Sequence, residues 1–132
     1  MVLNQKPRKI FLIDDDETSN FVSKIIIQAL DESIIVEVLN NGQEAIDHFS
    51  KTDDPPDLVL LDINMPFING FEFLDYYADQ NWNGRTKFAI YSTSSRESDK
   101  RKSMSYEQVI GYIEKPLNEA KLKDLLQKFS GQ

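Results

Sequence analysis

The feature that most constrains this chain is a regular alternation between short apolar runs and longer stretches with helical periodicity. Five such pairs follow one another, and the runs fall at residues 9–14, 33–39, 57–62, 87–92 and 109–114. Three of the runs are continuously apolar over residues 10–13, 58–61 and 88–91, which is typical of central strands buried on both faces. The alternation predicts an α/β protein with a parallel sheet covered by helices on both sides.

The stretches between the runs repeat apolar residues three and four positions apart, which predicts helices. The stripes comprise Phe21, Val22, Ile25, Ile26, Ala29 and Leu30; Ala45, Ile46 and Phe49; Phe71, Leu74, Tyr77 and Ala78; and Leu122, Leu125, Leu126 and Phe129. Asn41 begins a capping-box pattern, and Asn118 is placed to cap the last helix. Residues 96–106 offer only Met104 and Tyr106 as apolar anchors, so we expect a short or mobile helix there.

Length and charge limit the class of protein. A chain of 132 residues fits one domain, and we expect a single domain over residues 1–132 with a core at about 8–129. There is no cysteine, residues 1–8 lack the apolar stretch of a signal peptide, and no run approaches the ~20 apolar residues of a membrane span. We therefore expect a soluble cytoplasmic protein. The net charge of −7 argues against nucleic-acid binding, which needs Lys and Arg to neutralise phosphates.

Polar side chains stand where several predicted strands end. Asp14 and Asp15 end the first strand, Asp62 ends the third, Ser92 ends the fourth and Lys115 follows the fifth. In an open parallel sheet, ligands bind beyond the carboxyl ends of the strands, so we expect these side chains at one edge. Three carboxylates repel one another unless a cation lies among them, and hard oxygen ligands suit Mg2+. Lys115 could balance part of the charge and later pair with a phosphoryl oxygen.

Each of these residues also has a simpler interpretation. The acids from Asp14 onward could cap a helix and interact with its dipole, and Asp16 and Glu17 are expected to do only that. Asp62 could be an ordinary turn acid, and Lys115 a solvated lysine. The simpler interpretations would all have to hold at the same sheet edge, which favours a functional site.

Four sequence blocks give the chain a family resemblance from about residue 8 to residue 129. They are Ile10-Phe11-Leu12-Ile13-Asp14-Asp15-Asp16; Asp57-Leu58-Val59-Leu60-Leu61-Asp62-Ile63-Asn64-Met65-Pro66 with Gly70; Tyr91-Ser92-Thr93; and Gly111-Tyr112-Ile113-Glu114-Lys115-Pro116. In this order and at these spacings, they resemble the CheY-like receiver domains of two-component response regulators. The resemblance implies a doubly wound (βα)5, flavodoxin-like three-layer sandwich with strand order 2-1-3-4-5. The match takes up nearly the whole chain, so no output domain is expected within it.

The resemblance also implies a role for individual residues. Asp62 would be the phosphoacceptor, Asp15 a direct Mg2+ ligand, Asp14 a ligand through water, and the main-chain carbonyl of Asn64 a further ligand. The ammonium of Lys115 would hold a phosphoryl oxygen, with a cis bond to Pro116 directing the side chain. Ser92 would be the switch hydroxyl and Tyr112 the switch aromatic.

The implied reaction is in-line phosphoryl transfer from a phosphohistidine to the carboxylate of Asp62. The donor would be a sensor histidine kinase or a histidine phosphotransfer protein, and the signal would pass to an unknown downstream protein by contact or by phosphorelay. The phosphoryl group would draw Ser92 inward, and Tyr112 would rotate into the space left. Such a protein is a phosphoacceptor that assists its own phosphorylation and dephosphorylation rather than an enzyme, and no nucleic-acid or membrane partner is expected.

Two departures from the family pattern affect the expected switch. Ser92 stands where threonine is commoner, and the neighbouring Thr93 makes the choice of switch hydroxyl ambiguous; the spacings to Asp62 and Lys115 favour Ser92. The pair Ser105-Tyr106 replaces a usual small-residue turn, so the face around the fourth helix is expected to be atypical.

Three other functions compete with this one. A haloacid-dehalogenase-like phosphatase also uses a strand-end aspartate with Mg2+, but it usually has a second aspartate two residues later, where this chain has Asn64. A nucleotide-binding domain would need a glycine-rich loop after the first strand, where this chain has acids. A non-phosphorylated receiver-like docking module is the strongest alternative, although the intact acids and Lys115 argue against it.

Overall fold

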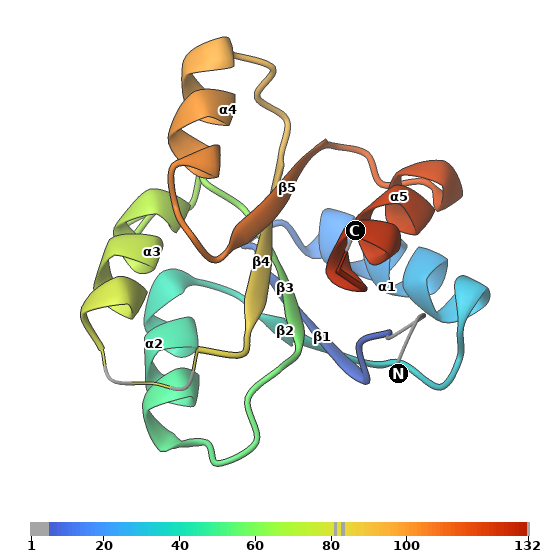
Figure 1. The fold of residues 1–132 in the computed structure, drawn as a ribbon, viewed down its shortest axis with the longest axis horizontal. Helices are drawn as coiled ribbons and strands as arrows, with labels where there is room; N and C mark the ends of the chain where they lie inside the picture. The colour runs from blue at the N-terminus through green and yellow to red at the C-terminus, as the bar shows by residue number, and fades with distance from the viewer. Residues whose placement is uncertain (1–5, 81, 83, 132) are drawn as a thin grey trace.

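The computed structural model describes residues 6–80, 82 and 84–131. It has five parallel strands that alternate with five helices (Figure 1). In chain order these are β1 (Lys9–Ile13), α1 (Glu17–Leu30), β2 (Ile35–Leu39), α2 (Gly42–Lys51), β3 (Leu58–Leu61), α3 (Gly70–Asp79), β4 (Lys87–Ser92), α4 (Glu97–Met104), β5 (Val109–Glu114) and α5 (Glu119–Phe129). The strand order is β2-β1-β3-β4-β5, which confirms the predicted doubly wound topology.

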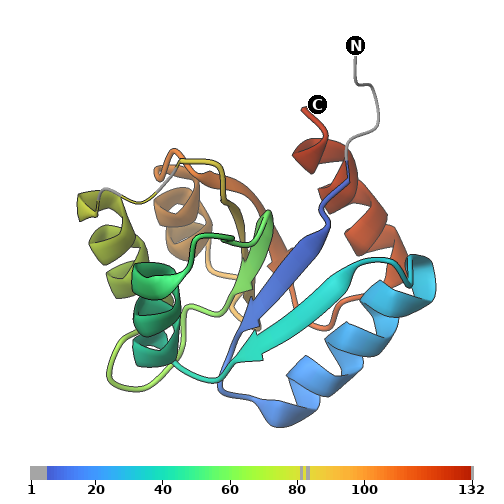
Figure 2. The same cartoon turned by 90° about the horizontal axis from the view of Figure 1, so that it is seen from below.

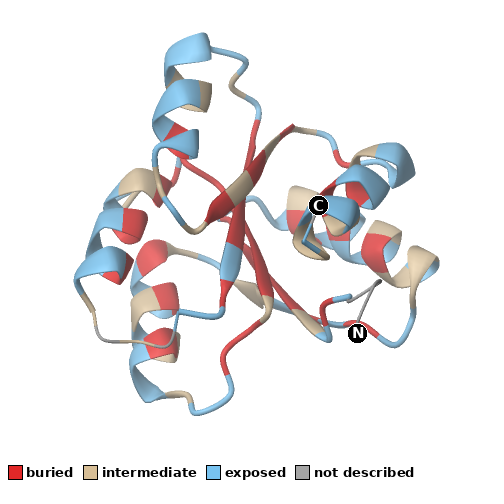
Figure 3. Cartoon of the chain, in the orientation of Figure 1, coloured by how far each residue is buried: buried red, intermediate tan, exposed pale blue. Residues whose placement is uncertain are grey.

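Alternate residues of each central strand point to opposite faces of the sheet and build two separate cores. Phe11, Val59 and Phe88 pack with α2 and α3 on one face, whereas Leu12, Leu60 and Tyr91 pack with α1 and α5 on the other. Figure 2 shows α1 and α5 together on one side of the sheet and α2 to α4 on the other. In Figure 3 the buried residues concentrate on the strands between the two helix layers. Three layers result, as predicted.

Side-chain caps fix several of the helix ends. The Asn41 side chain accepts a hydrogen bond from the backbone N–H of Glu44, and the Asn118 side chain accepts one from Lys121, so both predicted caps are present. The predicted capping box at Asn41 is only half formed, because the Glu44 side chain accepts from the backbone N–H of Asn40 instead. Asn69 and Glu72 complete a capping box at α3. The short α4 spans eight residues, and its start at Arg96 has no side-chain cap. The prediction of a weak fourth helix is confirmed in length.

Strand β2 begins two residues later than the sequence pattern predicted. Residues 31–34 form a turn, in which the Asp31 side chain accepts a hydrogen bond from the backbone N–H of Ser33 and the Asp31 carbonyl accepts one from Ile34. These bonds take the backbone groups that an earlier strand start would have used. Part of the polar N-terminal stretch (residues 1–5) and two positions of the loop before β4 (81 and 83) lie outside the described residues. Within the described part of the chain, no helix has the length and hydropathy needed to cross a membrane.

Candidate functional site

Two acids follow directly on neighbouring central strands at the carboxyl edge of the sheet. Strands β1 and β3 pair in register with Ile13 opposite Leu61, and the backbone N–H of Asp62 donates to the carbonyl of Ile13 at 3.0 Å. Asp14 and Asp62 are therefore placed side by side by ordinary sheet pairing. Both are buried, whereas Asp15 is exposed at the next position.

The three carboxylates form a compact group. Among the described residues, one oxygen from each of Asp14, Asp15 and Asp62 lies within 4.8 Å of the others. Burial, followed by the charge of Asp14, raises the pKa of Asp62 to about 6, although the hydrogen bond from the backbone N–H of Asn64 and the charge of Lys115 act to lower it. Ionisation of a carboxyl group is costly at this position, and a divalent cation would reduce that cost. The donor set of hard oxygens with one exposed member fits Mg2+, which keeps part of its water shell.

Lys115 supplies the positive charge of the site. Its Nζ lies 2.6 Å from Asp14 Oδ2 and 3.9 Å from Asp62 Oδ2. Burial pulls the pKa of Lys115 down, but the hydrogen bond and charge of Asp14 outweigh it, so the pKa lies above its ordinary value. Its backbone N–H donates to the carbonyl of Ser92 at 2.8 Å, and its peptide bond to Pro116 is cis. Lys115 is thus a charged ammonium held between two of the acids.

Ser92 is the hydroxyl that the structure brings to this edge. It is fully buried at the end of β4, and its Oγ lies 3.3 Å from the side-chain amide nitrogen of Asn64. The backbone N–H of Asn64 in turn donates to Asp62 Oδ1 at 3.0 Å. The neighbouring Thr93 is exposed. The fold therefore connects Ser92, rather than Thr93, with the surroundings of Asp62.

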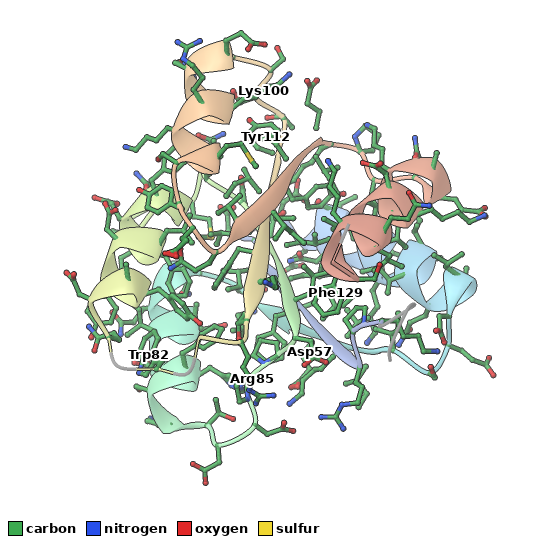
Figure 4. The ribbon with its side chains drawn as sticks, viewed as in Figure 1. Asp57, Trp82, Arg85, Lys100, Tyr112 and Phe129 are labelled. Carbon is green, nitrogen blue, oxygen red and sulfur yellow. The ribbon has the colours of Figure 1, made fainter. Side chains whose placement is uncertain are left out.

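Tyr112 lies behind the site rather than within the acidic group. Its ring is half-buried on β5, and its hydroxyl donates to the carbonyl of Ser94 in the loop between β4 and α4 at 2.8 Å. Figure 4 shows Tyr112 next to Lys100 of α4, whose Nζ lies 5.9 Å from the ring centroid. Tyr112 is thus hydrogen-bonded to the β4–α4 loop and, among the described residues, makes no hydrogen bond to the carboxylates.

Some residues around the site escaped the sequence interpretation. The buried side-chain amide of Asn20 donates to the carbonyl of Asp14 at 2.9 Å and so fixes the first acidic turn. The Tyr91 ring lies 5.2 Å from Lys115 Nζ, and its hydroxyl accepts a hydrogen bond from the backbone N–H of Leu117. An asparagine in a helix and a tyrosine in an apolar strand gave no sequence signal for these roles, because both depend on tertiary contacts.

The loop between β3 and α3 is shaped by two residues with unusual backbone requirements. A Cβ on Gly70 would lie 2.5 Å from the carbonyl oxygen of Asp62 and 2.8 Å from Cα of Ile63, so only glycine fits there. Phe67 has a positive φ of 67° and is 99% exposed. A bulky residue in the left-handed region is an outlier that costs energy without any gain from burial here.

A hollow of about 650 Å³ lies elsewhere in the molecule. It is lined by residues that include Trp82, Thr86 and Glu107, at the amino ends of β4 and β5. That is the opposite edge of the sheet from the acids. The hollow therefore has no part in the chemistry of the acidic group.

The topology and the acidic strand ends together define the class of the protein. A parallel sheet of order β2-β1-β3-β4-β5, with three acids and a lysine at its carboxyl edge, is the arrangement of a CheY-like receiver domain from two-component signalling. The family model of the response regulator receiver domain matches residues 10–127. The chain belongs to the response-regulator receiver family, whose members are phosphoacceptors rather than conventional enzymes.

Individual relatives agree with this assignment. The nitrate/nitrite response regulator protein NarL of Escherichia coli K12 is 36% identical over 96 residues, which cover 73% of this chain and 43% of NarL. The chain thus spans less than half the length of that relative. The chemotaxis protein CheY of Halobacterium salinarum is 28% identical over 120 residues, which cover 90% of this chain and 93% of that protein. The crystal structure of a two-component response regulator from Cytophaga hutchinsonii superposes with a TM-score of 0.83 at 27% identity, covering 97% of this chain and 100% of that one.

Proposed function

We propose that this chain is a Mg2+-dependent phosphoacceptor switch in which Asp62 receives a phosphoryl group from a phosphohistidine. The observation that carries the proposal is the position of Asp62, buried at the end of a central strand, next to Asp14 and 3.9 Å from the ammonium of Lys115. Asp62 thus has the carboxylate of Asp14 beside it, which favours metal binding, and the ammonium of Lys115, which favours an incoming phosphoryl group. A turn acid with no function would not need these partners.

In the proposed site, Asp15 would hold Mg2+ directly and Asp14 through water, and Asp62 and the main-chain carbonyl of Asn64 would complete the protein's share. Bound Mg2+ would neutralise carboxylate charge and stabilise charge on the phosphoryl oxygens. Lys115 would exchange part of its pairing with Asp14 for a phosphoryl oxygen. The Ser92 hydroxyl would donate a hydrogen bond to another phosphoryl oxygen, and Tyr112 would follow the β4–α4 loop, which begins after Ser92.

The proposed reaction forms a bond between a carboxylate oxygen of Asp62 and phosphorus and breaks the bond between phosphorus and the donor imidazole nitrogen. No proton need leave Asp62, because a carboxyl group with a pKa of about 6 is mostly ionised at neutral pH. Positioning and electrostatic stabilisation then account for the catalysis, which the chain provides to its own phosphorylation and dephosphorylation.

The proposed donor is a histidine kinase or a histidine phosphotransfer protein, as is usual for the receiver family. The downstream partner is a protein that binds by contact or takes the phosphoryl group onward to another histidine. We propose that residues 1–132 act as a single receiver unit in this exchange.

The experiment is incubation with acetyl phosphate and Mg2+, followed by intact mass measurement. We expect one phosphoryl adduct on the wild type, no adduct without Mg2+, and none on Asp62→Asn. Asp53→Asn is the matched control, because Asp53 is an exposed acid in the turn before β3. An unmodified wild type would favour the docking-module alternative, and an adduct that persists in Asp62→Asn would overturn the assignment of the acceptor.

A further inference from the structure

Ser94 joins three parts of the switch region through three different groups. Its backbone N–H donates to Ser92 Oγ at 3.0 Å, and its carbonyl accepts from the Tyr112 hydroxyl at 2.8 Å. Its own hydroxyl donates to Asp99 Oδ2 in the first turn of α4 at 2.6 Å. The same hydroxyl oxygen accepts from the backbone N–H of Arg96 at 3.2 Å. One residue therefore connects the buried strand-end hydroxyl, the aromatic ring and the start of a helix.

Helix α4 packs against β5, but few of its side chains are buried. Helix α4 has eight residues, and Ser103 is its buried residue. Its N-cap, Arg96, makes no side-chain cap hydrogen bond, and the Ser94 hydroxyl instead accepts from the N–H of Arg96 and donates to the Asp99 side chain in the first turn. The other contacts of α4 include a partly exposed ion pair between Lys100 and Glu114 at 2.9 Å. Partly exposed ion pairs of this kind contribute little to stability. The Ser94 side chain, bonded to Asp99 and to the N–H of Arg96, is thus a direct link between the loop and the first turn of α4.

We propose that Ser94 is a positioning residue whose side chain couples the phosphorylation of Asp62 to the position of α4. This inference rests on the proposed phosphoacceptor function. When the Ser92 hydroxyl turns toward a phosphoryl oxygen, the N–H of Ser94 that is bonded to its Oγ moves with it. The Ser94 hydroxyl transmits that movement to Asp99 and to the N–H of Arg96, and the first turn of α4 is displaced.

A second route from the same loop runs through the main chain. The Ser94 carbonyl holds the Tyr112 hydroxyl, and that contact would survive replacement of the side chain. The two routes therefore make different predictions for Ser94→Ala. If the side chain carries the coupling, α4 stops responding although Ser92 still senses the phosphoryl group. If the main chain carries it, α4 responds as before.

The test uses beryllofluoride, a phosphoryl mimic, at saturation with Mg2+, and amide chemical shifts from heteronuclear NMR spectra of the full chain. The wild type is compared with Ser94→Ala, Ser94→Thr, Asp99→Ala and Ser95→Ala. Ser95 is the matched control, because it is an exposed serine in the same loop and has no side-chain hydrogen bond among the described residues. Acetyl phosphate labelling of each variant is measured in parallel by intact mass.

In Ser94→Ala and in Asp99→Ala, we expect the beryllofluoride-induced shift changes of residues 97–104 to be at most about one third of those in the wild type. The shift changes at Ser92 and Asn64 should persist. Ser94→Thr keeps the hydroxyl and should respond like the wild type, as should Ser95→Ala. Unchanged α4 responses in Ser94→Ala would overturn the inference. A wild type that takes no phosphoryl group from acetyl phosphate would instead contradict the phosphoacceptor function, so the two failures are distinguishable.

Discussion

Lys115 is paired more closely with Asp14 than with Asp62: its Nζ lies 2.6 Å from the first carboxylate and 3.9 Å from the second. The lysine thus neutralises a neighbour of the proposed phosphoacceptor rather than the phosphoacceptor itself. Since the side chains of Asp14 and Lys115 are 2% and 11% exposed, the pair is largely shielded from water. Removing one partner of such a pair leaves the other charge without compensation.

The first prediction concerns Lys115→Met. Loss of the ammonium leaves three carboxylates together, so the free energy of unfolding of the metal-free protein should fall by about 3 kcal/mol. Mg2+ should restore more stability to this variant than it adds to the wild type, because the cation takes over the neutralising role. Urea unfolding with and without Mg2+ measures both effects. Lys24→Met, at an exposed position of α1, is the control and should change little.

The second prediction follows from the pKa of Asp62, which burial and the nearby Asp14 raise from 3.8 to about 6. The folded protein binds this proton more tightly than the unfolded chain does, so the ionised group destabilises the fold as pH rises from about 4 to 6. Metal-free wild type should therefore lose about 2 kcal/mol relative to Asp62→Asn over that range, allowing for solvent screening. Urea unfolding of both proteins across this range is the measurement. A difference between them that does not vary with pH would contradict the raised pKa.

The third prediction separates the two hydroxyls at the end of β4. Ser92→Ala removes a buried hydroxyl that accepts the Ser94 N–H, and the beryllofluoride-induced change at the Tyr112 amide should fall several-fold. Thr93→Ala removes an exposed hydroxyl and should leave that change intact. NMR spectra of the two variants with Mg2+ decide between them. The reverse pattern would assign the switch hydroxyl to Thr93.

The fourth prediction concerns Gly70→Ala. The added methyl group would lie 2.5 Å from the carbonyl oxygen of Asp62, which belongs to rigid backbone. We expect a loss of about 1 to 3 kcal/mol in the free energy of unfolding, with weaker Mg2+ binding, because Asp62 must shift to make room. Gly84→Ala is the control, since among the described residues no atom beyond its chain neighbours lies within 4 Å of the added Cβ. Equal effects of the two substitutions in thermal unfolding would argue against the clash.

The fifth prediction concerns Phe67, whose side chain buries almost nothing and whose φ is positive. Phe67→Gly removes the steric cost of the left-handed conformation but adds flexibility to the unfolded chain, so a net gain of about 0.5 to 1 kcal/mol is expected. Phe67→Ala keeps the Cβ and should give no comparable gain. Chemical denaturation of the two variants makes the comparison. If Phe67→Ala stabilised the protein as much as Phe67→Gly, the cause would be the loss of the aromatic ring rather than the backbone conformation.

The layered fold was predictable because the strongest local signals agree with the tertiary structure. The continuous apolar run before Asp14 can be buried on both faces only as a central strand, and β1 occupies that place. The start of β2 was predicted too early, since a turn held by the Asp31 side chain competes with strand pairing and gives no hydrophobic signal. The weak pattern before β5 correctly predicted a short helix.

The candidate site was predictable to the extent that strand ends define it. Asp14, Asp62 and Lys115 come together because parallel strands end at the same edge, and the distances agree with that expectation. The hydrogen bonds of Ser94 were not predictable, because its neighbours Thr93 and Ser95 also carry hydroxyls and only the folded loop distinguishes them. The left-handed conformation of Phe67 was not predictable either, because the residues usually found in that conformation are glycine and asparagine.

The in-register pairing of Ile13 with Leu61 has a consequence for kinetics. Two acids attached to adjacent strands of a packed sheet lose their freedom to move apart when the protein folds, so little reorganisation is left for the moment of reaction. In the proposed phosphoryl transfer, the acceptor side would then contribute a nearly constant part of the activation barrier. Differences in transfer rate between one phosphodonor and another would accordingly measure how well each donor docks and releases its phosphoryl group, and the receiver would serve as a fixed reference for comparing them.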